Sequence, residues 1–83
     1  MSSPIDRITA IAVRMLLKRG VTAIPGTRDN LRDAGLTSLD MVNLMLAIEA
    51  EFDIEIPQSA MTPDNFDTVA AVEALVSVTA KAA

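Results

Sequence analysis

The chain has 83 residues, of which 51% are hydrophobic and 22% charged, and it contains neither cysteine nor histidine. That length supports one small domain with one core, and the composition is too apolar for a disordered chain. The missing residue types exclude disulfides, thiolate and imidazole metal sites, and the side chains that most often perform acid–base or nucleophilic catalysis near neutral pH. We therefore expect a single domain over residues 1–83 that is not an enzyme.

The formal net charge of −4 is unevenly distributed along the chain. Six of the seven cations lie in residues 1–32, and nine of the eleven acids lie in residues 33–83. The acidic second part would repel nucleic acid and attract basic proteins. No stretch approaches the roughly 18 apolar residues of a membrane span, and no targeting segment is apparent. We expect a cytoplasmic monomer without membrane or nucleic-acid partners.

The first predicted helix begins after Ser3 and ends before Gly20. Ser3 can cap the helix, Pro4 suits its first position, and Asp6 places an acid in its first turn. Gly20 is a natural C-terminal stop. Apolar residues recur at helical spacing and should face the core: Ile5, Ile8, Ile11, Ala12, Met15 and Leu16.

Residues 21–37 form a long connection that contains proline, glycine and asparagine. Loops of this length are uncommon inside a small domain unless they are held in place. We expect apolar side chains to fix it to the core: Val21, Ile24, Leu31 and Leu36.

The second predicted helix runs from Ser38 to Phe52, with Thr37 or Ser38 as its cap. At about 100° per residue, one apolar set falls on a core-facing arc: Met41, Leu44, Met45, Ile48 and Phe52. A second set falls on nearly the opposite side: Leu39, Val42 and Leu46. So small a domain can hardly bury both sides of one helix, so the second set should be exposed unless the long loop covers it.

Residues 53–57 alternate like a strand but have no partner strand, so we expect an extended link. A short helical turn follows, with Thr62 as its cap and Pro63 in first position. The last helix should begin at Asp67 or Thr68 and end near Thr79, with these residues facing inward: Val69, Val72, Leu75, Val76 and Val78. The sequence thus predicts an all-α fold, a small four-helix bundle with three main helices plus one short helix and a long loop between helices one and two. The acids of residues 53–67 lack the spacing of a calcium loop, so no metal site is predicted.

Ser38 is the candidate functional residue because it opens the second helix. A phosphate ester on its hydroxyl would meet the free N–H groups of the first turn and the positive end of the helix dipole. On the helical wheel Ser38 lies roughly 40° from Val42, beside the second apolar set. A serine at this position is also a common N-cap without further function.

Residues 35–44 (GLTSLDMVNL) and 48–57 (IEAEFDIEIP) resemble the acyl carrier protein family. Its pattern is glycine, two residues, serine and leucine, followed by an acidic amphipathic helix that ends in E-F-x-x-x-I-P. The likeness spans about residues 5–79. It implies that Ser38 carries a covalent 4'-phosphopantetheine arm, which a separate phosphopantetheinyl transferase takes from coenzyme A. Cargo would ride on the arm as a thioester, loaded by a charging ligase and passed to a downstream transferase.

The resemblance also implies that the second helix is the docking face. Its partner-docking residues would be the exposed apolar set with the acids around it: Leu39, Asp40, Val42, Leu46, Glu49 and Asp53.

Three positions depart from the family pattern. Thr37 stands where the family usually has an aspartate that is associated with metal and cofactor placement during arm transfer. Asn43 and Ala50 stand where acids are common, which thins the docking face. These departures indicate a specialised carrier rather than that of fatty acid synthesis.

Residues 34–38, 44–49 and 52–57 resemble one subgroup in particular, the stand-alone carriers that truncated, synthetase-like ligases charge with amino acids. The matching patterns are A-G-L-[ST]-S, L-M-L-x-I-E and F-D-I-E-[FI]-P. A carrier of a polyketide or peptide-synthetase pathway remains an alternative. A second alternative is an acidic helical adaptor without a prosthetic group, docking a basic partner through the second helix.

Overall fold

The computed structural model describes the backbone of residues 3–82 and the side chains of residues 3–80. The elements in chain order are α1 (Pro4–Lys18), α2 (Leu31–Ala34), α3 (Ser38–Phe52), a 3₁₀ turn η1 (Gln58–Ala60), α4 (Pro63–Phe66) and α5 (Val69–Ala82). No strand forms within residues 3–82. The predicted all-α bundle is confirmed, with α1, α3 and α5 as its main helices and α4 as the short one; α2 and η1 are additional.

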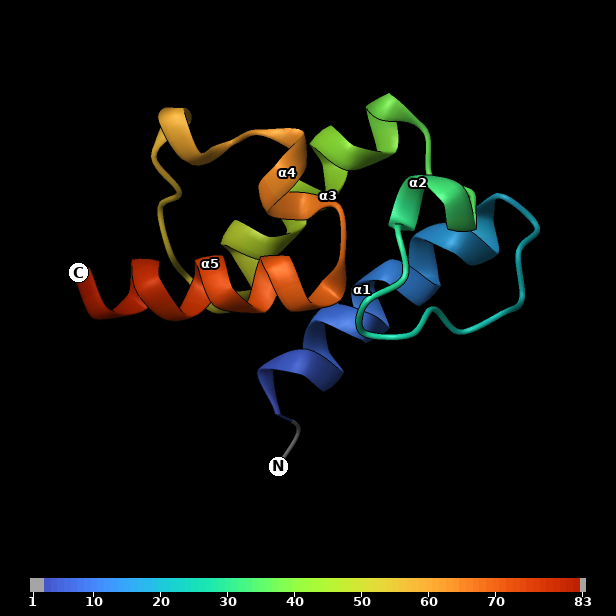
Figure 1. Ribbon diagram of the computed structural model, residues 1–83, viewed down its shortest axis with the longest axis horizontal. Helices are drawn as coiled ribbons and strands as arrows, with labels where there is room; N and C mark the ends of the chain where they lie inside the picture. The colour runs from blue at the N-terminus through green and yellow to red at the C-terminus, as the bar shows by residue number, and fades with distance from the viewer. Residues whose placement is uncertain (1–2, 83) are drawn as a thin grey trace.

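Both α3 and α5 pack against α1, and the short α4 bridges α3 and α5 (Figure 1). The long loop after α1 swings around one end of the molecule before it enters α2 (Figure 1). The N-terminus of α3 therefore follows closely on α2, at the end of the bundle away from the chain's C-terminus.

Helix α1 begins and ends where the sequence predicts. Ser3 Oγ accepts a hydrogen bond from the Asp6 N–H at 3.1 Å, and Pro4 occupies the first helical position. At the other end Arg19 is the C-cap, and Gly20 follows with a φ of +81° that disfavours any other residue.

The loop between α1 and α3 is fixed mainly by its second half. Leu31 and Leu36 are buried as expected, but Ile24 is 74% exposed, so its assignment to the core was wrong. The buried side chain of that stretch is instead Pro25. Two backbone hydrogen bonds tie this loop to the start of α5, from the Leu31 N–H to the Asp67 carbonyl and from the Ala70 N–H to the Thr27 carbonyl.

Helix α2 is the element that the sequence analysis missed. Asn30 caps it by accepting from the Asp33 N–H at 2.9 Å, and Gly35 ends it with a φ of +136°. A helix of four residues is too short to show a hydrophobic period, so only its cap and its glycine could have predicted it.

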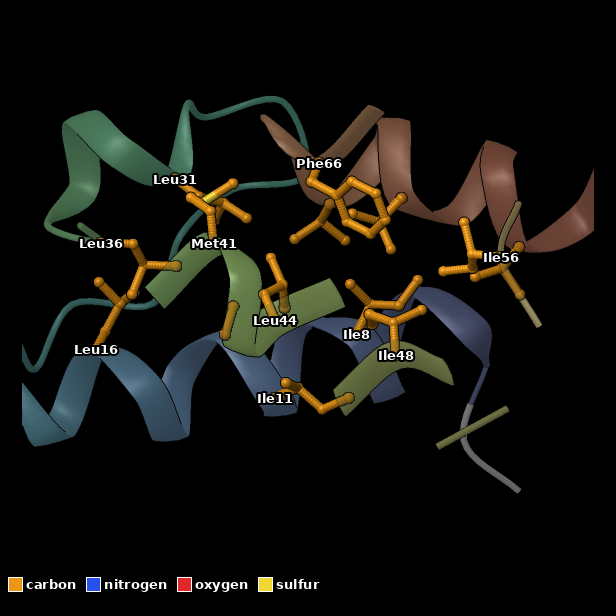
Figure 2. Packing of buried hydrophobic residues seen from close by; sticks show 14 residues of the cluster. Ile8, Ile11, Leu16, Leu31, Leu36, Met41, Leu44, Ile48, Ile56 and Phe66 are labelled. Carbon is orange, nitrogen blue, oxygen red and sulfur yellow. The ribbon is translucent and has the colours of Figure 1, made fainter. Parts of the chain in front are cut away.

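The core contains side chains from α1, α2, α3, α4 and α5 and from the connections between them: Ile8, Ile11, Ala12, Leu16, Leu31, Leu36, Met41, Leu44, Ile48, Ile56, Phe66, Val69, Val72 and Val76. Figure 2 shows Ile8 of α1 meeting Leu44 and Ile48 of α3, with Phe66 above them. Val78 was expected to face inward but is exposed on α5.

Residues 53–57 are an extended link, as predicted. Asp53 ends α3 in the left-handed conformation, with φ +51°. The Ile56 side chain is buried in the core and anchors the link there.

Candidate functional site

Ser38 is the first residue of α3, and its side chain is exposed. The cap is its neighbour: Thr37 Oγ1 accepts from the Asp40 N–H at 3.1 Å, and Asp40 Oδ2 accepts from the Thr37 N–H at 2.9 Å. This reciprocal capping box stabilises the helix start without Ser38. The sequence left open whether Thr37 or Ser38 caps this helix. The structure shows that Thr37 is the cap and that the Ser38 hydroxyl has no capping role.

The backbone around Ser38 suits a negatively charged group. The N–H groups of the first helical residues, Ser38 and Leu39, have no intrahelical acceptor, and the dipole of the 15-residue α3 is positive at this end. An exposed hydroxyl beside such donors fits a serine-linked phosphodiester. The chain has no cysteine, so any thiol chemistry here would be supplied by a group attached to that serine.

Asp40 does not lie on the surface where the sequence analysis placed it. It is only 7% exposed, and its carboxylate takes two hydrogen bonds from Arg19, Nε to Oδ2 at 2.8 Å and Nη2 to Oδ1 at 2.9 Å. The Arg19 guanidinium, helped by the Thr37 N–H, holds the pKa of the Asp40 carboxyl well below its ordinary value. A carboxylate enclosed in this way is not free to meet a partner, which corrects the expectation that Asp40 belongs to the docking face.

The second apolar set of α3 is exposed, as expected. Leu39, Val42 and Leu46 are 66%, 49% and 56% exposed, and we call these three residues the α3 patch. The connection between α1 and α3 is instead hydrogen-bonded to the start of α5. Exposed leucines and valines that share one helical face are typical of an interaction surface.

The other two acids of the predicted docking face differ from each other. Asp53 is exposed. Glu49 is half-buried, and its Oε2 accepts a hydrogen bond from the Ile56 N–H at 2.9 Å. One oxygen of Glu49 therefore holds the link after α3 in place. The acidic surround of the α3 patch is thinner than the sequence predicts.

A small open cleft lies directly beside Ser38, between α3 and the start of α4. Its volume is about 130 Å³, and it is lined by Arg32, Ser38, Met41, Val42, Met45 and Pro63. Its walls are mainly apolar, with one cation at the rim.

Residues 3–80 contain no group of three acids, histidines or cysteines arranged to hold a metal ion. Within residues 3–82, every helix is too short or too polar to cross a membrane.

Arg19 is the site residue that the sequence analysis did not single out. It is 21 positions away from Asp40, and the two lie on different elements. No periodicity or motif connects them, so only the folded structure reveals their pairing.

Comparisons with known proteins agree with this geometry. The family model described as a phosphopantetheine attachment site matches residues 7–76. Aminoacyl carrier protein 1 of Bradyrhizobium diazoefficiens is 46% identical over 71 residues, which cover 86% of this chain and 79% of that protein.

Solved structures agree as well. One is a crystal structure of Bradyrhizobium japonicum glycine:[carrier protein] ligase complexed with its cognate carrier protein and an analogue of glycyl adenylate. A chain in it matches with a TM-score of 0.81 and 41% identity, covering 90% of this chain and 96% of that one. A second, of the same ligase with glycylated carrier protein, matches with a TM-score of 0.79 and 42% identity, over 87% and 96% of the two chains.

A helical bundle that presents an exposed serine without a capping role at a helix start fits a carrier domain. The chain belongs to the phosphopantetheine-binding family of acyl and aminoacyl carrier proteins. The predicted family and the 4'-phosphopantetheine cofactor are both confirmed. The protein holds its cargo as a thioester on that covalent arm and delivers it to partner enzymes.

Proposed function

We propose that Ser38 is the attachment point of the arm and that the cargo is an amino acid. The attachment at Ser38 is supported by one observation at the start of α3. Thr37 caps the helix, and the neighbouring Ser38 hydroxyl is exposed and has no capping role. In the transfer, Ser38 Oγ loses its proton and forms the new P–O bond, while the pyrophosphate bond of coenzyme A breaks and the nucleotide leaves. Bound there, the arm supplies the thiol that the chain lacks.

An amino acid as cargo is supported by the proteins that this chain resembles. The matched relative is an aminoacyl carrier protein, and a matched solved structure contains a glycylated carrier.

The α3 patch is the proposed docking surface for three partners: a phosphopantetheinyl transferase, a charging ligase and a downstream transferase. The patch adjoins Ser38 on the same helix, so a partner that covers Leu39, Val42 and Leu46 has its active site near the arm. Asp53 and the free oxygen of Glu49 add negative charge at the far end of α3 and favour basic contacts there.

The remaining elements of the proposal follow from the carrier role. We propose that the chain is one carrier domain and acts as a cytoplasmic monomer. Catalysis rests with the partner enzymes, because the chain has none of the histidine or cysteine side chains that such chemistry usually requires.

Charging in vitro tests the proposal. The purified protein is first incubated with coenzyme A and a promiscuous phosphopantetheinyl transferase. It is then incubated with glycine, ATP and a glycine:[carrier protein] ligase. Intact mass should rise by one arm and then by one glycyl group, and hydroxylamine should remove the glycyl group because a thioester is labile to it. Ser38→Ala should show neither addition. An arm that no aminoacyl ligase charges, but that an acyl ligase does, would contradict the amino acid cargo.

A further inference from the structure

Two ion pairs connect the first helix and its C-cap to α3 within the described residues, one at each end of α3. Near the C-terminus of α3, Arg7 forms an ion pair with Glu51 at 2.8 Å. Arg7 also lies over the ring of Phe52, 4.3 Å from the ring centroid. Near its N-terminus Arg19 pairs with Asp40 at 2.8 Å. Both ion pairs join the first helix or its C-cap to α3, but only the pair between Arg19 and Asp40 contacts the turn that presents Ser38.

The Arg19 side chain reaches two residues of that turn. Besides its two hydrogen bonds to the Asp40 carboxylate, Nη2 lies 3.4 Å from Thr37 Oγ1. Arg19 is itself held at the end of α1, since its N–H donates to the Leu16 carbonyl at 2.9 Å. The guanidinium thus connects a fixed point on α1 to the N-terminus of α3.

Asp40 Oδ2 links the Arg19 guanidinium to Thr37, the residue before Ser38. The same oxygen accepts from Arg19 Nε at 2.8 Å and from the Thr37 N–H at 2.9 Å. The second bond holds Thr37 in its extended conformation, with φ −86° and ψ 172°. Thr37 directly precedes Ser38, so its backbone conformation sets the position of Ser38 at the start of α3.

We propose that Arg19 is a positioning residue for modification at Ser38: through Asp40 and Thr37 it holds the serine hydroxyl in the orientation in which its oxygen attacks the pyrophosphate of coenzyme A in the transferase. This inference rests on the proposed attachment at Ser38. Without the guanidinium, the Asp40 carboxylate loses its charged partner and turns toward water. The Thr37 N–H then loses its acceptor, the first turn of α3 frays, and the serine oxygen samples more orientations. Reactions that depend on orientation slow sharply when the reacting atom is displaced.

Val42 and Leu46 of the α3 patch lie beyond the first turn of α3, and they take no part in the hydrogen bonds and ion pairs of this network. Docking of the transferase should therefore persist when Arg19 is replaced. The predicted kinetic signature is a lower kcat for arm transfer with a nearly unchanged KM for the carrier. General loss of folding would not separate the two constants in this way.

The experiment compares Arg19→Ala with Arg7→Ala, which breaks the matched ion pair at the other end of α3. Transfer from coenzyme A is followed by intact mass over a range of carrier concentrations. We expect Arg19→Ala to lower kcat about tenfold and to change KM less than about twofold. Arg7→Ala should change both constants less than about twofold. Equal kcat values for wild type and Arg19→Ala, or an equal loss of kcat in both variants, would overturn the inference.

Amide hydrogen exchange gives a second readout that needs no transferase. The Thr37 N–H should exchange faster in Arg19→Ala than in wild type and should be unchanged in Arg7→Ala. If Arg19→Ala does not fold, Arg19→Lys replaces it in both measurements, because lysine keeps the charge but loses the bidentate contact with Asp40. The kcat of Arg19→Lys should then lie between those expected for wild type and Arg19→Ala. A wild-type kcat in Arg19→Lys would contradict the inference. If wild type itself takes up no arm at Ser38, the proposed function fails, whereas a modified wild type with an unaffected Arg19 variant refutes the positioning role alone.

Discussion

Thr37 and Asp40 cap the first turn of α3 reciprocally, each side chain accepting the backbone N–H of the other, at 3.1 Å and 2.9 Å. This relationship releases Ser38 from the capping role that a serine at a helix start usually has. The functional consequence is that stability and modification are assigned to adjacent hydroxyls.

Replacing Thr37 by alanine should separate the two roles. Thr37→Ala removes the oxygen that accepts the Asp40 N–H, which should lower the free energy of unfolding by about 1 kcal/mol. Urea unfolding measures this loss, with Thr37→Ser as the control that keeps the capping oxygen. The arm should still be attached to Thr37→Ala. Complete loss of modification in this variant, at a temperature where it is folded, would contradict the choice of Ser38 over Thr37 as the attachment point.

The Arg19–Asp40 pair should make stability depend on pH in the acid range. The pKa of Asp40 is lower in the folded protein than in the unfolded chain, so the stabilisation is fully present above the unfolded value, about 4, and is lost as the pH falls through the folded value. Asp40→Asn removes this contribution. The difference in unfolding free energy between wild type and Asp40→Asn should therefore be constant between about pH 5 and 7 and should shrink below about pH 4. A difference that stays constant down to pH 2 would contradict the charge pairing.

Two leucines on α3 provide a matched comparison between core and surface. Leu44 is fully buried and Leu46 is 56% exposed. Leu44→Ala should lower the free energy of unfolding by about 2 to 5 kcal/mol, whereas Leu46→Ala should change it by about 0.5 kcal/mol or less. In charging assays Leu46→Ala should raise the KM for the carrier. Equal destabilisation by both substitutions would place the α3 patch in the core.

Glu49 and Asp53 should respond differently to loss of charge. Glu49→Ala removes the acceptor of the Ile56 N–H and should lower the free energy of unfolding by about 1 kcal/mol. Asp53→Asn keeps a residue that tolerates the left-handed conformation at φ +51°, so urea unfolding should hardly change. If Asp53 serves docking, Asp53→Asn should raise the ligase KM without a loss of stability. An unchanged KM would remove it from the docking face.

Features that depend on local spacing were predictable from the sequence. The caps of α1, the span of α3 and its two apolar faces follow from side-chain types at helical intervals, and the structure reproduces them. The family resemblance adds the serine motif, which no spacing argument alone separates from a cap.

Features that depend on contacts between distant segments were not predictable. Ile24 and Val78 are apolar residues that remain largely exposed in the fold. Asp40 reads as a surface acid until Arg19, 21 residues earlier, is seen to enclose it. Which of Thr37 and Ser38 caps α3 also depends on the orientation of the Asp40 side chain, which accepts a hydrogen bond from the Thr37 N–H.

Fragmentation mass spectrometry of the modified protein tests the central claim most directly. After coexpression with a promiscuous phosphopantetheinyl transferase, the peptide that contains residues 37 and 38 is isolated and sequenced, with Ser38→Ala as the control. The account predicts one arm, on Ser38 in wild type and on no residue in the variant. An arm on Thr37, or an unmodified wild-type peptide with several transferases, would contradict it.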